Sequence, residues 1–123
     1  MRIIVADAHD NFRNVLVELL RDEGHDASGV AHGGELVPTA VRVVPDVIVT
    51  HVRFPDLDAL EALSYLARAN VRIATVLMSG DLRAIPYAEA ERLGVVAYLE
   101  KPFSINELRA ALAEAARSSR KIA

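Results

Sequence analysis

Four short stretches of this chain carry side chains that could do chemistry, and each follows a run of apolar residues. They are Asp7-Ala8, His51, Ser79-Gly80 and Lys101-Pro102. An imidazole can accept a phosphoryl group, bind a transition metal or titrate near neutral pH. A serine and an aspartate near it also raise the possibility of a Ser-His-Asp arrangement. The choice among these depends on how the fold places the four stretches.

Strand and helix patterns alternate five times along the chain, which predicts an α/β fold. Continuous apolar strands between amphipathic helices indicate a parallel sheet that is covered on both faces, and the length suits a single domain spanning 1–123. In such sheets the functional crevice lies outside the carboxyl ends of the strands, where the four stretches would meet. The expected strands are 2–6, 27–31, 47–50, 71–78 and 95–99, and the expected helices are 12–24, 35–43, 58–70, 87–93 and 104–117.

Capping residues refine this prediction. Asp58, with Glu61 three residues later, indicates an acidic N-cap, and Ser104 to Glu107 form a capping box. Pro38 is tolerable only near the first turn of its helix. The polar tail from Ser118 to Ala123 is expected to fray.

Composition narrows the function classes. The net charge is −3, and the basic residues are dispersed, which argues against nucleic-acid binding by this domain. The chain has no cysteine, so thiolate chemistry is excluded. No apolar run is long enough for a membrane helix and no signal peptide is expected, so a cytoplasmic domain is predicted. The stretch after the first strand, residues 8–11, has no glycine, which disfavours a dinucleotide fold.

The strand-end motifs, taken in order, resemble the receiver domain of response regulators, the phosphoacceptor module of two-component signalling. The resemblance covers nearly the whole chain and implies a doubly wound five-stranded parallel sheet, a flavodoxin-like (βα)5 receiver fold with strand order 2-1-3-4-5. The motifs are Ile3 to His9, Pro45 to His51 with Phe54 to Glu61, Leu77 to Gly80, and Gly94, Tyr98 and Leu99 to Phe103. The resemblance also implies a cis bond between Lys101 and Pro102.

Two positions depart from the family's pattern. The family uses three carboxylates, one that accepts the phosphoryl group and two that help to hold Mg²⁺. Here Asp7 remains, but Ala8 stands in the second acidic position and His51 stands at the phosphoacceptor position. We therefore expect Lys101 to pair with Asp7, Mg²⁺ binding to be lost or weak, and no cofactor. The chain resembles an atypical pseudo-receiver with a degenerate pocket of Asp7, Ala8, His51, Ser79 and Lys101.

Several roles for His51 stay open. The imidazole could fill the pocket with a hydrogen bond to Ser79, Asp7 or a backbone group. It could instead form phosphohistidine, act as a pH switch, or bind a transition metal together with Asp7 and His9. Nearby, Arg53 and Asp81 could pair across the mouth of the crevice. No enzymatic activity is expected, because no oxyanion hole accompanies Ser79, His51 and Asp7.

The leading function hypothesis is a phosphorylation-independent signalling and protein-interaction module. Its partner would be a signalling protein such as a histidine kinase or a regulator, with a homodimer as another option. The alternatives are a small-ligand or transition-metal sensor that uses the degenerate pocket, and the N-terminal receiver of a longer transcription regulator. Tyr98 could be a packed aromatic or a moving switch. The candidate contact surface consists of Arg83, Tyr87, Glu91, Tyr98, Asn106 and Arg109.

Overall fold

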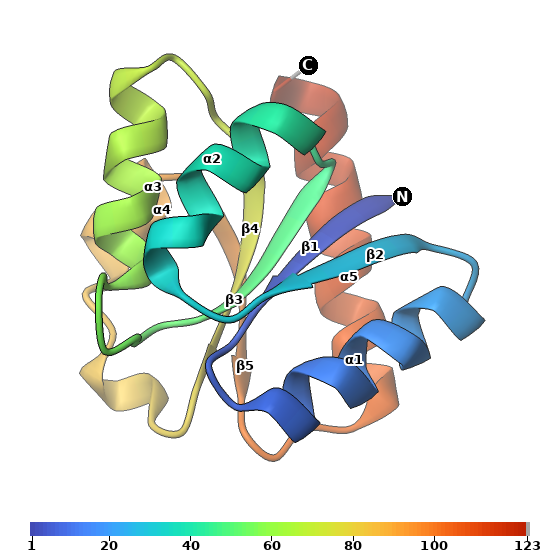
Figure 1. The fold of residues 1–123 in the computed structure, drawn as a ribbon. Coiled ribbons are helices and arrows are strands. Elements are labelled where there is room, and N and C mark those ends of the chain that lie inside the picture. Colours follow the sequence, from blue (N-terminus) through green and yellow to red (C-terminus); the bar gives the residue numbers. More distant parts are fainter. Residues whose placement is uncertain (123) are drawn as a thin grey trace.

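Strands and helices alternate through the whole of the computed structural model, which describes the backbone of residues 1–122 and the side chains of residues 1–119. Helices α1 to α5 follow strands β1 to β5 in turn, and a short 3-10 helix, η1, precedes α4 (Figure 1). The bounds are β1 Arg2–Ala6, α1 Asp10–Asp22, β2 Asp26–Val30, α2 Gly33–Val43, β3 Val47–His51, α3 Ala59–Arg68, β4 Ala74–Ser79, η1 Leu82–Ala84, α4 Tyr87–Arg92, β5 Val95–Glu100 and α5 Ile105–Ile122.

The five strands form one parallel sheet, as the residue patterns predict, and its order β2-β1-β3-β4-β5 is the one that the resemblance implies. Helices α1 and α5 cover one face, and α2, α3 and α4 cover the other (Figure 1). Alternate residues of a strand point to opposite faces, so the apolar runs serve two cores. In β1, for example, Ile3 and Val5 pack with α1 and α5, whereas Ile4 packs with α2 and α3. This doubly covered sheet fixes the positions of the strand ends.

Several predicted boundaries are wrong. Strand β4 begins at Ala74 instead of residue 71, because Val71 closes the end of α3 with a 2.8 Å hydrogen bond to the Leu66 carbonyl. Pro38 lies in the middle of α2, beyond the first turn. The buried residues Leu36 and Ala40 of α2 offset the lost backbone hydrogen bond. Helix α5 runs to Ile122, so its bounds include most of the polar tail whose fraying stays a prediction, and Ala123 lies outside the described residues.

The two predicted caps have different outcomes. The capping box is confirmed, because the Glu107 amide donates to Ser104 Oγ at 3.0 Å and the Ser104 amide donates to Glu107 Oε1 at 3.1 Å. Asp58 does occupy the N-cap position of α3, but its side chain makes no capping hydrogen bond. The backbone of Asp58 has the extended conformation of an N-cap, while its Oδ1 is buried and has no hydrogen-bond partner in the part of the chain that the structure describes. The predicted capping role of this side chain is therefore wrong.

Asp56 binds the N-terminus of α2, a contact that the sequence analysis did not anticipate. Its Oδ1 accepts from the Gly33 amide at 3.1 Å, and its Oδ2 accepts from the Gly34 amide at 2.9 Å. A Cβ on Gly33 would lie 1.9 Å from the Leu57 carbonyl oxygen, so glycine permits the close approach. This contact fixes the loop that follows β3, which carries Arg53 and Asp58.

The Asp56 contact predicts a pH-dependent contribution to stability. The amides of Gly34 and, to a smaller extent, Gly33 lower the pKa of Asp56 below its usual value of 3.8. A lowered pKa in the folded state gives stability that is present above the unfolded-state pKa and lost as pH falls through the folded-state pKa. Asp56→Ala should therefore lower the free energy of unfolding at pH 7, and its difference from wild type should shrink between about pH 5 and about pH 3.

Urea unfolding at several pH values measures this difference. Asp22→Ala, at an exposed carboxylate that ends α1, is the control for the loss of one surface carboxylate, and the pH-dependent loss in Asp56→Ala is measured relative to it. If the free energy of unfolding of Asp56→Ala were lower than that of wild type by the same amount at every pH, the predicted contribution of the ionised carboxylate to stability would be contradicted.

Candidate functional site

The four chemistry-bearing stretches meet at the carboxyl edge of the sheet. Asp7 directly follows β1, His51 ends β3, Ser79 ends β4 and Lys101 directly follows β5. The parallel register aligns His51 with Met78 and Ser79 with Glu100, so neighbouring strands end at similar heights. The sequence therefore predicts correctly where these residues lie in the fold.

Asp7 and Lys101 form an ion pair with 2.6 Å between Asp7 Oδ2 and Lys101 Nζ, as the sequence analysis expects. The Asp7 residue is only 3% exposed. Its other carboxylate oxygen, Oδ1, accepts a 2.9 Å hydrogen bond from the His9 amide. Both oxygens of this carboxylate are thus engaged by groups of the protein itself.

One aromatic ring contacts the ammonium group of Lys101 from another side. Lys101 Nζ lies 4.0 Å from the centre of the Phe12 ring, a cation–π contact. The Phe12 ring meets Phe103 edge-on at 6.0 Å, which brings the start of α1 against the turn after β5. The bond between Lys101 and Pro102 in that turn is cis, as the resemblance implies.

His51 bonds to the backbone of its own loop. Its Nδ1 lies 3.0 Å from the Arg53 carbonyl oxygen and 3.2 Å from the Arg53 amide nitrogen. The tautomer decides whether Nδ1 donates to the first or accepts from the second. The sequence left open a hydrogen bond from His51 to Ser79, to Asp7 or to a backbone group, and in the structure the partner is the backbone of Arg53.

Ser79 is also satisfied locally. Its hydroxyl donates to the Asp81 carbonyl at 3.1 Å and accepts from the Asp81 amide at 3.1 Å. Among the described residues, no hydrogen bond joins Ser79, His51 and Asp7. The Ser-His-Asp arrangement is therefore not assembled.

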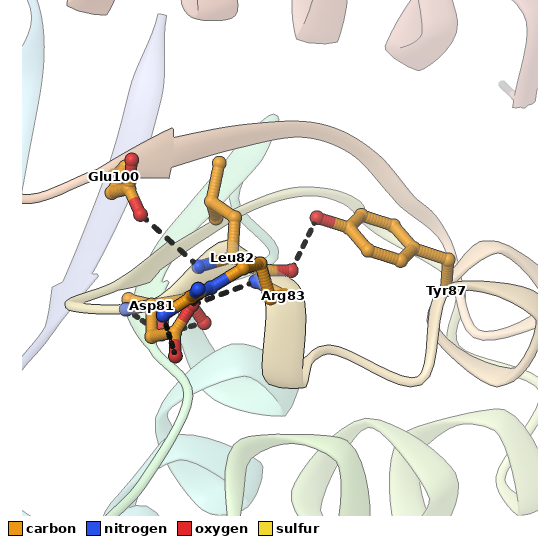
Figure 2. A network of polar contacts seen from close by, with 6 residues as sticks. Asp81, Leu82, Arg83, Tyr87 and Glu100 are labelled. Carbon is orange, nitrogen blue, oxygen red and sulfur yellow. Dashed lines mark hydrogen bonds and ion pairs between the residues drawn. The ribbon is translucent and has the colours of Figure 1, made fainter.

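Asp81 pairs with Arg83 instead of crossing the crevice to Arg53. Arg83 Nε lies 3.0 Å from Asp81 Oδ1, and Arg83 Nη2 lies 3.3 Å from Asp81 Oδ2 (Figure 2). Side chains two residues apart in a tight turn meet at little entropic cost, which explains the local pairing. The pair between Arg53 and Asp81, which the sequence left open, is thus not formed among the described residues.

The loop between β4 and α4 is tied down at both ends. Figure 2 shows the Leu82 amide donating to Glu100 Oε1 at 3.4 Å, and the Tyr87 hydroxyl donating to the Leu82 carbonyl at 2.7 Å. The Tyr87 ring also meets the Tyr98 ring at 4.7 Å in an edge-on contact. These contacts connect η1, α4 and β5 into one continuous surface.

Tyr98 is a packed aromatic residue in this structure. Its hydroxyl is buried and has no hydrogen-bond partner among the described residues. Burial raises the pKa of Tyr98, and the charges of Glu91 and Tyr87 raise it further. This phenol therefore stays protonated and neutral at physiological pH.

The residues of the candidate contact surface fall into two groups. Arg83, Tyr87, Glu91 and Tyr98 belong to η1, α4 and β5. Arg109 instead faces α1, where its Nε lies 2.6 Å from Glu23 Oε1, and it also donates to Asn106 Oδ1 at 3.4 Å.

Other residues of α5 lie beside Tyr98 on the surface next to β5. Glu107, Ala110 and Glu114 line a shallow groove beside β5 together with it. The helical spacing of residues 107, 110 and 114 is the signal that would have identified them from sequence.

The transition-metal set of Asp7, His51 and His9 is not brought together. Within residues 1–119, no group of three His, Cys, Asp or Glu side chains lies close enough to hold a metal ion. His9 serves instead as the N-cap of α1, because its Nδ1 accepts from the Phe12 amide at 3.2 Å.

In the described part of the chain, no helix is long and apolar enough to cross a membrane.

Solved structures support the fold independently. A response regulator receiver domain from Clostridium thermocellum superposes with a TM-score of 0.85 at 21% identity, covering 99% of this chain and 98% of that one. A CheY-like receiver domain protein from Methanospirillum hungatei superposes with a TM-score of 0.87 at 18% identity, with the same coverage of 99% and 98%.

Sequence comparisons extend the likeness to regulatory proteins. The transcriptional regulatory protein PdtaR of Mycobacterium tuberculosis is 34% identical over 122 residues, which cover 98% of this chain and 59% of PdtaR. The sporulation initiation phosphotransferase F of Bacillus subtilis is 26% identical over 113 residues, which cover 90% of each chain. This chain thus spans less than two thirds of the length of PdtaR.

The model of the response regulator receiver domain matches residues 3–113. That range includes β1 from Ile3 onward, the other four strands and the strand-end residues described above. The family is a signalling module whose members interact with histidine kinases and other signalling proteins. This chain belongs to the response-regulator receiver family.

Proposed function

We propose that this receiver domain signals through its surface without phosphorylation at the family's phosphoacceptor site. The observation that carries the proposal is the 2.6 Å ion pair between Asp7 and Lys101, in a pocket whose other two acidic positions hold Ala8 and His51. The side chain that would accept the phosphoryl group is an imidazole bonded to its own loop.

The charge of the pocket supports this proposal. Three carboxylates and one lysine, as in the family's pattern, sum to about −2, whereas Asp7, Lys101 and a neutral His51 sum to about zero. Mg²⁺ prefers oxygen ligands at about 2.1 Å in nearly octahedral geometry. The structure offers one carboxylate whose two oxygens already accept from His9 and Lys101. These residues do not fit a Mg²⁺ site, so we expect its binding to be lost or weak.

The surface formed by η1, α4, β5 and the β5 side of α5 is the proposed contact region. Tyr98 packs against Tyr87, and Glu100 and Tyr87 fix Leu82 of the preceding loop. A surface held by such contacts needs no phosphoryl group to order it. Its partner would be a signalling protein, such as a histidine kinase or another regulator, or a second copy of this chain.

A longer transcription regulator is the proposed context for this domain. PdtaR is a transcriptional regulatory protein, and this chain spans 59% of its length. In that setting the receiver surface would contact an output domain. The chemistry proposed for the pocket is the same in either context.

Incubation with acetyl phosphate and Mg²⁺ tests the proposal. Wild-type protein should show no stoichiometric mass increase of one phosphoryl group by intact mass spectrometry after rapid quenching. The double variant Ala8→Asp/His51→Asp restores the missing carboxylates and should gain a phosphoryl group that requires Mg²⁺. A stoichiometric adduct on wild-type protein that disappears in His51→Asn would instead establish phosphohistidine and refute the proposal.

The ion pair itself should contribute measurably to stability. Lys101→Met leaves the buried carboxylate of Asp7 without its cation and should lower the free energy of unfolding by about 1–3 kcal/mol. We allow less than the full cost of breaking a buried pair, because the Lys101 side chain is 22% exposed. Urea unfolding at pH 7 measures the loss.

The pair between Arg109 and Glu23 is a matched control, since it has the same 2.6 Å separation but lies on the surface. Arg109→Gln should cost clearly less than Lys101→Met. Equal losses in the two variants would show that burial of Asp7 does not strengthen its dependence on Lys101.

A further inference from the structure

A cavity of about 330 Å³ lies between the loop that follows β3 and the loop that follows β4. His51 and Ser79 line it, but Asp7 and Lys101 do not. The ion pair and the cavity are therefore separate parts of the carboxyl edge. The walls of this cavity combine two unpaired charges with an apolar surface.

The negative charge belongs to Asp58. Asp58 lines the cavity, its side chain makes no capping hydrogen bond, and its Oδ1 is buried without a hydrogen-bond partner among the described residues. A buried acceptor with no donor typically costs about 1–3 kcal/mol. Rotation about the soft terminal torsion of an aspartate exchanges its two oxygens, so either oxygen can turn toward a donor in the cavity. Asp58 is thus suited to receive an ammonium group.

The positive charge belongs to Arg53. Its backbone holds His51, while its guanidinium forms no ion pair within the part of the chain whose side chains the structure describes. The other carboxylate on the cavity wall, Asp81, is already neutralised by Arg83. One carboxylate and one guanidinium therefore remain available, and the charge of the wall balances.

Between these charges the wall is apolar. Leu60, Ile85 and Pro86 line the cavity, and Leu60 and Ile85 belong to the core on that face of the sheet. Ligand cavities usually measure about 300–1,000 Å³, so this one suits a ligand at the small end of that range. A phosphate ion would be repelled by Asp58, and a simple cation would leave Arg53 unpaired.

We propose that this cavity binds a small zwitterion with an aliphatic body, of the class of free aliphatic amino acids. Its ammonium group pairs with Asp58, its carboxylate pairs with Arg53, and its side chain packs on Leu60, Ile85 and Pro86. The ligand would bridge the two loops and so bias the position of η1 and α4. This site does not depend on whether the domain is phosphorylated, so its test is independent of the acetyl phosphate experiment.

The test is a titration of the intact chain with each of the twenty standard amino acids, followed by amide chemical shifts in ¹⁵N–¹H NMR spectra. At least one aliphatic amino acid should shift residues 51–60 and 79–86 with a Kd of about 1 mM or lower. Asp58→Asn and Arg53→Gln should each raise that Kd about tenfold. The matched controls Glu61→Gln and Arg92→Gln, at exposed positions outside the cavity wall, should leave it unchanged.

Leucine analogues separate the two charged contacts. Isoamylamine lacks the carboxylate, so its binding should respond to Asp58→Asn and not to Arg53→Gln. Isocaproate lacks the amine and should show the reverse pattern.

Two results would overturn the proposal. One is the absence of shifts with every amino acid at about 10 mM. The other is binding that neither Asp58→Asn nor Arg53→Gln weakens more than the controls do. Arg53 is exposed and the Asp58 side chain makes no hydrogen bond in the described structure, so both variants should keep the dispersed spectrum of the folded protein.

Discussion

The ion pair between Asp7 and Lys101 is the interaction on which the carboxyl edge of this domain depends. It joins the end of the first strand to the turn after the last strand, across 94 residues of sequence. Since the Asp7 carboxylate is almost fully buried, its charge needs a cation and hydrogen-bond donors close by. Lys101 and the His9 amide supply them, and Phe12 holds the lysine from its other side.

This pairing divides the edge of the sheet into two parts. On one side, Asp7 and Lys101 satisfy each other. On the other side, His51 and Ser79 each bond to the backbone of their own loop. In the family's pattern these positions act together on one phosphoryl group. Here Asp7 and Lys101 pair with each other, and His51 and Ser79 each bond to their own loop. The cavity that Asp58 and Arg53 line is a separate part of this edge, and neither Asp7 nor Lys101 lines it.

Much of this arrangement follows from the sequence because it rests on local patterns or on strand order. Apolar runs and helical spacing predict the parallel sheet, and the sheet in turn predicts that Asp7, His51, Ser79 and Lys101 meet at one edge. The capping box at Ser104 is local and is predicted correctly. The pairing of Lys101 with Asp7 follows from charge once Ala8 and His51 have removed the competing acids.

The contacts that sequence reasoning missed depend on side-chain directions that no local pattern encodes. Asp56 reaches the N-terminus of α2 from a loop more than 20 residues away, so no capping motif reveals it. Asp58 has the position of an N-cap, yet its side chain does not cap the helix, and the residue lines a cavity that lies between two loops far apart in sequence. Arg109 turns toward Glu23, the residue that follows α1, and this long-range pair depends on how α5 packs against α1.

A Mg²⁺ titration of the wild-type chain, followed by ¹⁵N–¹H NMR, measures whether the pocket binds the metal ion, and the proposed lack of phosphorylation depends on the loss of that binding. With Lys101 and His9 engaging both oxygens of Asp7, the amides of His9, Val52 and Lys101 should show no saturable shift up to about 20 mM Mg²⁺. Saturable shifts of these amides with a Kd of about 1 mM or lower would contradict the account, because they would show that a metal ion displaces Lys101 from Asp7.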